Sequence, residues 1–120
     1  MIKNKTGVWG EVYAARYLRE NGYKIITTNY ICHFGEIDII AEKGGKLRFI
    51  EVKARGEDFL MRPEEAVDEI KQRRIALTAN YFMTVMSEER TAAFDVCEVY
   101  LGEDDKLKKI NYIPDAFEEA

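Results

Sequence analysis

The chain has 120 residues, 47% of them hydrophobic and 33% charged, which is the balance expected of one globular domain spanning residues 1–120. A net charge of −4 and a pI of about 5.1 argue against avid, non-specific binding of nucleic acid, although Lys and Arg clustered on one surface would still permit binding. Without an apolar run of 18 residues, a signal-peptide pattern or metal-binding cysteine spacing, we expect a cytoplasmic protein with reduced thiols and no membrane contact.

The first predicted element is an amphipathic helix over about residues 6–21. Val12, Ala15 and Leu18 recur at helical spacing and define a buried stripe. Glu11 falls inside that stripe, and a carboxylate on a core-facing side of a helix is uncommon. The pattern leaves two explanations open. Glu11 could be structural, in an ion pair or turned sideways to solvent, or it could belong to a functional site.

A strand is expected next, over residues 23–28, followed by a connection over residues 29–34. That connection holds His33, the single histidine of the chain. His33 could act as a general base, but the surrounding sequence favours a solvent-facing loop residue.

Two further strands are predicted over residues 37–41 and 47–52, which are rich in β-branched and aromatic residues. Gly44 and Gly45 lie between them, and a Gly-Gly pair can adopt the positive φ angles of a two-residue hairpin turn. A turn centred there places Phe49 opposite Ile40. The same register places Glu51 opposite Asp38 and Lys53 opposite Glu36.

Glu36, Asp38, Glu51 and Lys53 then share one face of the hairpin, because side chains alternate along a strand. Opposed carboxylates on apolar strands are unfavourable, and a hard divalent cation such as magnesium would relieve the repulsion. Lys53 would add a positive charge suited to stabilising a phosphate transition state. The pattern is also compatible with a structural salt bridge, and a one-residue bulge would move one acid to the other face.

Residues 54–62 have no clean period and are interpreted as a mobile loop. Arg55 could reach a phosphate from this loop or remain a solvated arginine at its rim. A second helix is predicted from Pro63 to about Met86. Lys71 and Arg74 share one of its faces, where they could contact a phosphate backbone or form part of a solvated, charge-balanced surface.

The C-terminal part reads as two more strands. The first covers residues 92–101, with Asp95 interpreted as structural, and the second covers residues 107–113 and is expected to end at Pro114. Phe117 is the predicted anchor of the chain end to the core.

Asp38 followed by Glu51-Val52-Lys53 matches the D…(D/E)-x-K signature of the restriction-endonuclease-like, or PD-(D/E)XK, nucleases. More closely, the whole chain resembles the YraN-like family of small bacterial predicted endonucleases, which are similar to archaeal Holliday-junction resolvases. Family members often carry arginines where this chain has Ile31, Cys32, His33 and Ala93. The matching segments run in order along the sequence and are Gly10-Glu11, Gly35-Glu36-Ile37-Asp38, Phe49-Ile50-Glu51-Val52-Lys53, Lys71, Phe94-Asp95-Val96 and Ala116-Phe117.

The resemblance implies an α/β fold with a mixed central β-sheet flanked by helices, and a magnesium- or manganese-dependent endonuclease acting on nucleic acid, especially branched DNA. A homodimer is compatible with it. Two other classes stay open, a catalytically silent nucleic-acid-binding or partner-binding module and a structural dimerisation protein. The site residues implied are Glu11, Asp38, Glu51 and Lys53 for catalysis, Asp38, Glu51, the Val52 carbonyl and Glu11 for the metal, and Arg55, Lys71 and Arg74 for nucleic acid.

Overall fold

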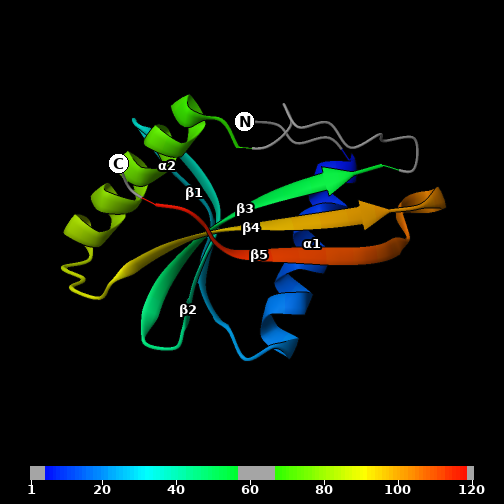
Figure 1. Cartoon of the computed structure of the whole chain (residues 1–120), viewed down its shortest axis with the longest axis horizontal. Helices are drawn as coiled ribbons and strands as arrows, with labels where there is room; N and C mark the ends of the chain where they lie inside the picture. Colours follow the sequence, from blue (N-terminus) through cyan, green and yellow to red (C-terminus); the bar gives the residue numbers. More distant parts are fainter. Residues whose placement is uncertain (1–4, 57–66, 119–120) are drawn as a thin grey trace.

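The computed structural model describes residues 5–56 and 67–118. Within these ranges a helix is followed by three strands, a second helix and two further strands with a 3₁₀ turn between them (Figure 1). The described part contains no helix long and apolar enough to span a membrane. The elements are α1 (Lys5–Glu20), β1 (Lys24–Cys32), β2 (Gly35–Lys43), β3 (Lys46–Arg55), α2 (Glu69–Val85), β4 (Ala92–Leu101), the 3₁₀ turn η2 (Glu103–Asp105) and β5 (Leu107–Phe117).

The five strands form one sheet in the order β1-β2-β3-β4-β5. β3 and β4 are parallel, whereas the other neighbouring pairs are antiparallel. A parallel pair needs a long crossover connection, and α2 lies in the segment between β3 and β4. The predicted α/β class with a mixed central sheet is confirmed, and the arrangement is consistent with a restriction-endonuclease-like fold.

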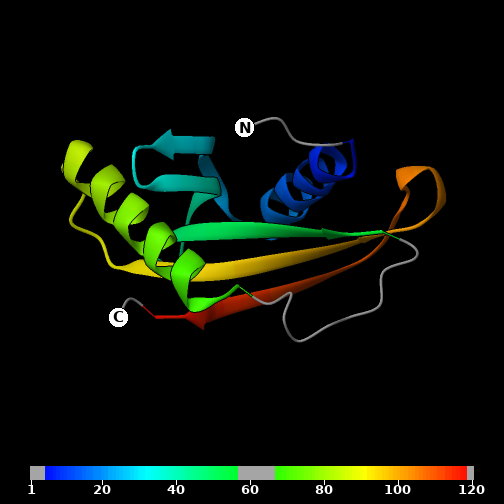
Figure 2. The same ribbon diagram turned by 90° about the horizontal axis from the view of Figure 1, so that it is seen from above.

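The two helices cover different parts of the sheet and define two hydrophobic clusters. Phe82 of α2 packs with Phe49 and Phe94, whereas Leu18 of α1 packs with Ile50 on the other side of β3. Consecutive residues of β3 thus face different helices, as the alternation of side chains along a strand requires. Figures 1 and 2 show α2 beside one half of the long strands and α1 beside the other half.

The β2–β3 hairpin has the predicted turn, and its paired part has the predicted register, but the predicted pair of Glu36 and Lys53 is wrong because pairing ends before it. Gly44 and Gly45 have φ angles of 64° and 77°, and Ile40 pairs with Phe49. Backbone pairing runs from Lys43–Lys46 to Ile39–Ile50. At the next position the Asp38 carboxylate accepts a hydrogen bond from the Val52 N–H at 2.8 Å. A side chain therefore bonds a β3 amide at the place where the two strands separate, and we call this point the fork.

The predicted ends of two strands, β1 and β5, are wrong. β1 continues to Cys32 rather than ending at Thr28, and Asn29 within it has a φ of 52°. Asn tolerates this left-handed conformation better than most residues, so the strand continues beyond Asn29. β5 continues through Pro114 to Phe117 instead of stopping at the proline. It is an edge strand with a shifted register at this point, where a missing N–H is tolerated.

The expected loop and second helix also need correction. Ala54 and Arg55 are the last residues of β3, while residues 57–62 of the expected loop lie outside the described residues. Val67 and Asp68 are not helical, and α2 begins at Glu69 with Asp68 as its N-cap. The Asp68 carboxylate accepts a hydrogen bond from the Lys71 N–H at 2.8 Å, which is the usual N-cap contact. The predicted residues 63–66 lie outside the described part of the chain.

The chain end is anchored as predicted. The Phe117 ring stacks on Phe94 with centroids 5.2 Å apart, and Phe94 in turn stacks on Phe49 at 5.8 Å. These contacts attach β5 to the α2-side core.

Candidate functional site

Asp38 and Glu51 meet at the fork, as the hairpin register predicts. Their side chains are only 6% and 7% exposed, and a hydrogen bond joins the two carboxyl groups. Asp38 is held by the Val52 N–H, so its position depends on the separation of β2 from β3. Two carboxyl groups in contact and nearly out of water are costly unless a proton or a cation sits between them.

The protonation of this pair follows from its surroundings. Burial, together with the Asp38 carboxylate, raises the pKa of Glu51 to about 8 from its usual 4.5, although Lys71 opposes the shift. The Lys71 ammonium of α2 forms an ion pair with Glu51. Burial works against that charge, but the hydrogen bond and charge of Glu51 prevail and raise the pKa of Lys71. The fork therefore holds two acids and one cation in close contact.

Lys53 is half-buried on β3, two residues beyond Glu51 and on the same side of the strand. Burial lowers the pKa of Lys53, and the positive charge of Lys71 lowers it further, while Glu51 partly restores it. A lysine in such surroundings gives up its proton more readily than a free one. Lys53 can thus act as a donor or as a proton-transfer group next to the acids.

The α2-side pocket, a cavity of about 520 Å³, opens onto these acids. Asp38 and Glu51 lie on its sheet side, and Lys71 and Arg74 of α2 lie on its helix side. Glu36 also lines it, three residues before Ile39, the last β2 residue that pairs with β3. Acidic and basic side chains therefore surround one opening.

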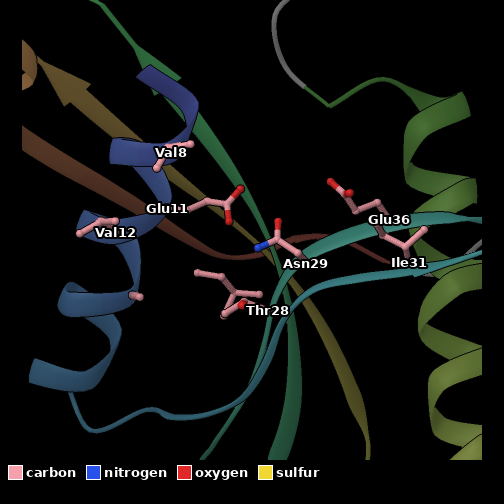
Figure 3. Close-up of a pocket in the computed structure, with 9 residues that line it drawn as sticks. Val8, Glu11, Val12, Thr28, Asn29, Ile31 and Glu36 are labelled. Atoms are coloured by element: carbon pink, nitrogen blue, oxygen red, sulfur yellow. The ribbon is translucent and has the colours of Figure 1, made fainter. Parts of the chain in front are cut away.

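A second cavity, of about 460 Å³, lies between α1 and the β1–β2 pair, and we call it the α1-side pocket. Figure 3 shows the Glu11 carboxylate on α1 pointing toward Asn29 and toward the side from which Glu36 approaches. Its remaining lining is largely apolar and includes Val8 and Ile31. Because Glu36 lines both pockets, they lie next to each other along β2.

Close helix packing fixes Glu11 in this pocket. A Cβ added to Gly10 would come within 2.7 Å of the Cβ of Ala54 on β3, so α1 approaches the strand more closely than any larger residue would permit. Gly10 is buried, whereas its neighbour Glu11 is half-buried at the pocket. The position of Glu11 in the predicted buried stripe thus reflects a pocket rather than a closed core.

The donor set suits a hard divalent cation only in part. Across residues 5–56 and 67–118, no three His, Cys, Asp or Glu side chains lie together as a formed metal site. Asp38 and Glu51 do supply two adjoining carboxyl groups, and the proton that their hydrogen bond requires is what a cation would replace. Glu11 and Glu36 lie in the neighbouring pocket.

Both expectations for Arg55 assumed a position at the surface, but the side chain is buried. It is 5% exposed, and its guanidinium lies 3.4 Å from a Glu98 carboxylate oxygen. The cause is that β3 extends to Arg55 and stays paired with β4. Contact with a phosphate would require this buried ion pair to open.

The other singled-out residues lie as follows. Arg74 is exposed and lines the α2-side pocket, as a phosphate contact would require. Asp95 is fully buried and accepts hydrogen bonds from Arg48 at 3.1 Å and from the Asp115 N–H at 2.8 Å, which confirms its structural role. His33 is exposed in the β1–β2 turn and lines neither pocket, which confirms the solvent-facing interpretation.

Three features of the site were not predicted. Glu36 was placed on the hairpin face without a role, Asn29 was assigned only to the connection after the first strand, and Lys71 was expected to face outward rather than pair with Glu51. Asn29 offered a signal, since an Asn within a β-branched strand often marks a left-handed residue. The Lys71–Glu51 pair offered none, because it joins elements 20 positions apart whose packing depends on the whole fold.

Comparison with known proteins places this architecture in a family. The model of the family described as "Uncharacterised protein family UPF0102" matches residues 10–99. A UPF0102 protein of Syntrophus aciditrophicus is 44% identical over 117 residues, covering 97% of this chain and 91% of the relative. A UPF0102 protein of Lachnoclostridium phytofermentans is 45% identical over 111 residues, covering 91% of this chain and 93% of the relative. None of these descriptions states an activity, but matches of this length and identity establish the kinship, and the chain belongs to the UPF0102 family.

Proposed function

We propose that this protein is a metal-dependent endonuclease that hydrolyses phosphodiester bonds in nucleic acid, with structured or branched DNA as the substrate class. The observation that carries the proposal is the Asp38–Glu51 pair, buried at the fork and flanked by Lys53 and Lys71. Two buried acids in contact, with two lysines close by, are expensive to keep in a fold of this size. Their chemistry matches what phosphodiester hydrolysis requires.

Asp38 and Glu51, with the Val52 carbonyl, would hold the magnesium or manganese ion, and Glu11 would join them directly or through water. Bound there, the ion would supply Lewis-acid activation of a water molecule and of the phosphate. The α2-side pocket gives the phosphate a place beside the acids, because Asp38 and Glu51 line it together with Arg74. Arg74 is then in a position to bind a phosphate oxygen.

Lys53 would orient the attacking water or stabilise the charge that develops on the phosphate. Its lowered pKa supports this, because a half-buried ammonium in a poorly solvated site interacts more strongly with developing negative charge than an exposed one. Lys71 would balance the charge of Glu51 and hold its carboxylate in place. Both lysines would therefore favour a site that becomes more negative during the reaction.

One observation favours a second candidate, a binding module without turnover. Lys71 already forms an ion pair with Glu51, so the acids have a partner within the fold. In that case the fork would stabilise the fold, and the exposed Arg74 would serve binding alone.

The test is a cleavage assay on end-labelled four-way-junction, single-stranded and duplex DNA, and on single-stranded RNA. Purified protein is incubated with magnesium, manganese or EDTA. We expect metal-dependent cleavage of at least the junction, and loss of that cleavage in Asp38→Ala but not in Asp104→Ala, an exposed acid in η2. Binding without cleavage of any substrate with either metal would reject the endonuclease in favour of the binding module.

A further inference from the structure

Three aromatic rings form a cluster near the C-terminal end of α2, away from the acids. His33 and Phe34 of the β1–β2 turn lie 4.1 Å apart between ring centroids, and His33 meets Tyr81 of α2 edge-on at 5.3 Å. Phe34 and Tyr81 are both 37% exposed, and His33 is exposed as well. We call these three residues the aromatic cluster. Exposed aromatic rings held in place by one another offer preformed surfaces for stacking.

The aromatic cluster is continuous with the α2-side pocket. Arg74 lines that pocket, and a Cβ built on Gly35, the residue after Phe34, would lie 3.5 Å from the Arg74 Cβ. Leu77, 41% exposed, lies three residues after Arg74 and four before Tyr81, so all three share one side of the helix. From Lys71 to Tyr81 the helix rises about 15 Å, a distance that a few nucleotides cross.

Charge along this strip favours one type of occupant. Arg73 and Arg74 are exposed on the helix between the acids and the aromatic rings, although the whole chain carries a net charge of −4. An arginine next to exposed rings provides what an unpaired nucleotide needs, a cation for the phosphate and a ring for the base. Paired bases cannot use the rings, because their faces are covered by neighbouring base pairs.

We propose that the aromatic cluster and Arg74 bind a single-stranded nucleic-acid segment whose bases stack on Phe34 and Tyr81, and that they lead this segment to the fork. This inference deepens the proposed function, since it assigns the enzyme a substrate with unpaired nucleotides beside the scissile bond. The binding itself requires no turnover and can be measured separately. A second copy of this chain is the competing occupant of the same surface, and the test distinguishes it.

The experiment is fluorescence anisotropy of labelled oligo-dT, oligo-U and a blunt DNA duplex, in EDTA so that no cleavage occurs. The variants are Phe34→Leu/Tyr81→Leu, the conservative Tyr81→Phe, Arg74→Ala, and the control Trp9→Leu, which removes an aromatic residue 38% exposed on α1. Circular dichroism confirms folding, and sedimentation measures the oligomeric state of each variant. The oligo-dT and oligo-U arms show whether the segment is DNA or RNA.

We expect the double leucine variant to lose about 10-fold or more in single-strand affinity, the scale of one lost stacking contact, with duplex affinity within about 2-fold. Tyr81→Phe and Trp9→Leu should bind like the wild type, and Arg74→Ala should lower the log–log salt slope by about 0.7. Equal losses for duplex and single strand, or no loss in the folded double variant, would overturn the proposal. A dimer that dissociates in the double variant without a change in single-strand affinity would assign the surface to a second copy.

Failure of the two proposals can be told apart. If the double variant cleaves normally but the wild type shows no preference for single strands, the aromatic cluster is excluded and the endonuclease stands. If oligonucleotides bind through the rings but no substrate is cleaved with magnesium or manganese, the endonuclease fails while the single-strand site remains.

Discussion

The two pockets on either side of β2 contain similar acids in different surroundings. On the α2 side, Asp38 and Glu51 are almost fully buried, touch each other and have a lysine partner. On the α1 side, Glu11 is only half-buried, and its pocket is lined mostly by apolar side chains. The contrast favours the α2 side as the place of the proposed chemistry, with Glu11 on the α1 side in a supporting role.

The largest expected effect tests the α2 side of this comparison. Lys53→Ala should reduce cleavage by about 10²–10³ with either metal, the scale of losing one preorganised electrostatic group. Affinity for junction DNA should stay within a few-fold of the wild type, because one ammonium is a small part of a phosphate-binding surface. Single-turnover cleavage and anisotropy measure the two quantities separately. The matched control is Lys46→Ala, an exposed lysine at the other end of β3, and a parallel loss there would show that the effect is non-specific.

The α1 side should respond less. Glu11→Gln keeps the shape of the side chain and removes its charge, and we expect cleavage to fall about 10–100-fold, as for residues that act on a metal site through an intermediate group. Raising the magnesium concentration should recover part of this loss if Glu11 contributes to metal affinity. Glu20→Gln, at the exposed end of the same helix, is the control. A loss as large as that of Lys53→Ala would contradict the ranking of the two sides.

How far the sequence predicted the site depends on whether the information was local. The Gly44–Gly45 turn and strict alternation along the strands determine the register, and with it the meeting of Asp38 and Glu51. The strand separation at that point was not predictable, because there a side chain, the Asp38 carboxylate, bonds a backbone amide in place of the regular strand pairing. The local sequence pattern therefore predicts that Asp38 and Glu51 face each other, but it does not predict the fork or the pocket beside it.

The remaining errors share one physical cause, which is that tertiary pairing overrode a local signal. Pro114 is a strand breaker by its chemistry, but an edge strand with a shifted register accommodates it. Arg55 follows a strand and precedes a glycine, which suggested a loop, but pairing with β4 extends β3 and buries the guanidinium beside Glu98. Lys71 was recognised as important from the resemblance, whereas its ion pair with Glu51 required the packing of α2 against the sheet.

The third prediction tests the contact that fixes the α1 side. Gly10→Ala should destabilise the fold by about 1–3 kcal/mol through overpacking against Ala54, partly offset by about 1 kcal/mol of helix propensity. The measurement is urea unfolding followed by circular dichroism. Arg19→Ala, at an exposed position of the last helical turn, is the control and should change stability by less than about 0.5 kcal/mol. A stabilised Gly10→Ala variant would mean that α1 can shift, and that Glu11 is not held in place.

The smallest expected effect returns to the acids at the fork. Asp38→Asn retains an oxygen that can accept the Val52 N–H and leaves the Glu51–Lys71 pair intact, but it removes one of two opposed charges. The gain in the metal-free protein should be about 0.5–1 kcal/mol. The gain should grow with pH, because burial and Asp38 raise the pKa of Glu51 to about 8. The stability that this group contributes to the wild type is fully present below about 4.5 and is lost as pH rises through about 8, where both acids are ionised. Thermal unfolding at pH 6 and pH 9 in EDTA measures this difference.

Added magnesium should raise the melting temperature of the wild type and leave that of Asp38→Asn unchanged, because a ligand stabilises only the form that binds it. Equal magnesium shifts in both proteins would mean that the cation binds elsewhere and that the acid pair at the fork is structural.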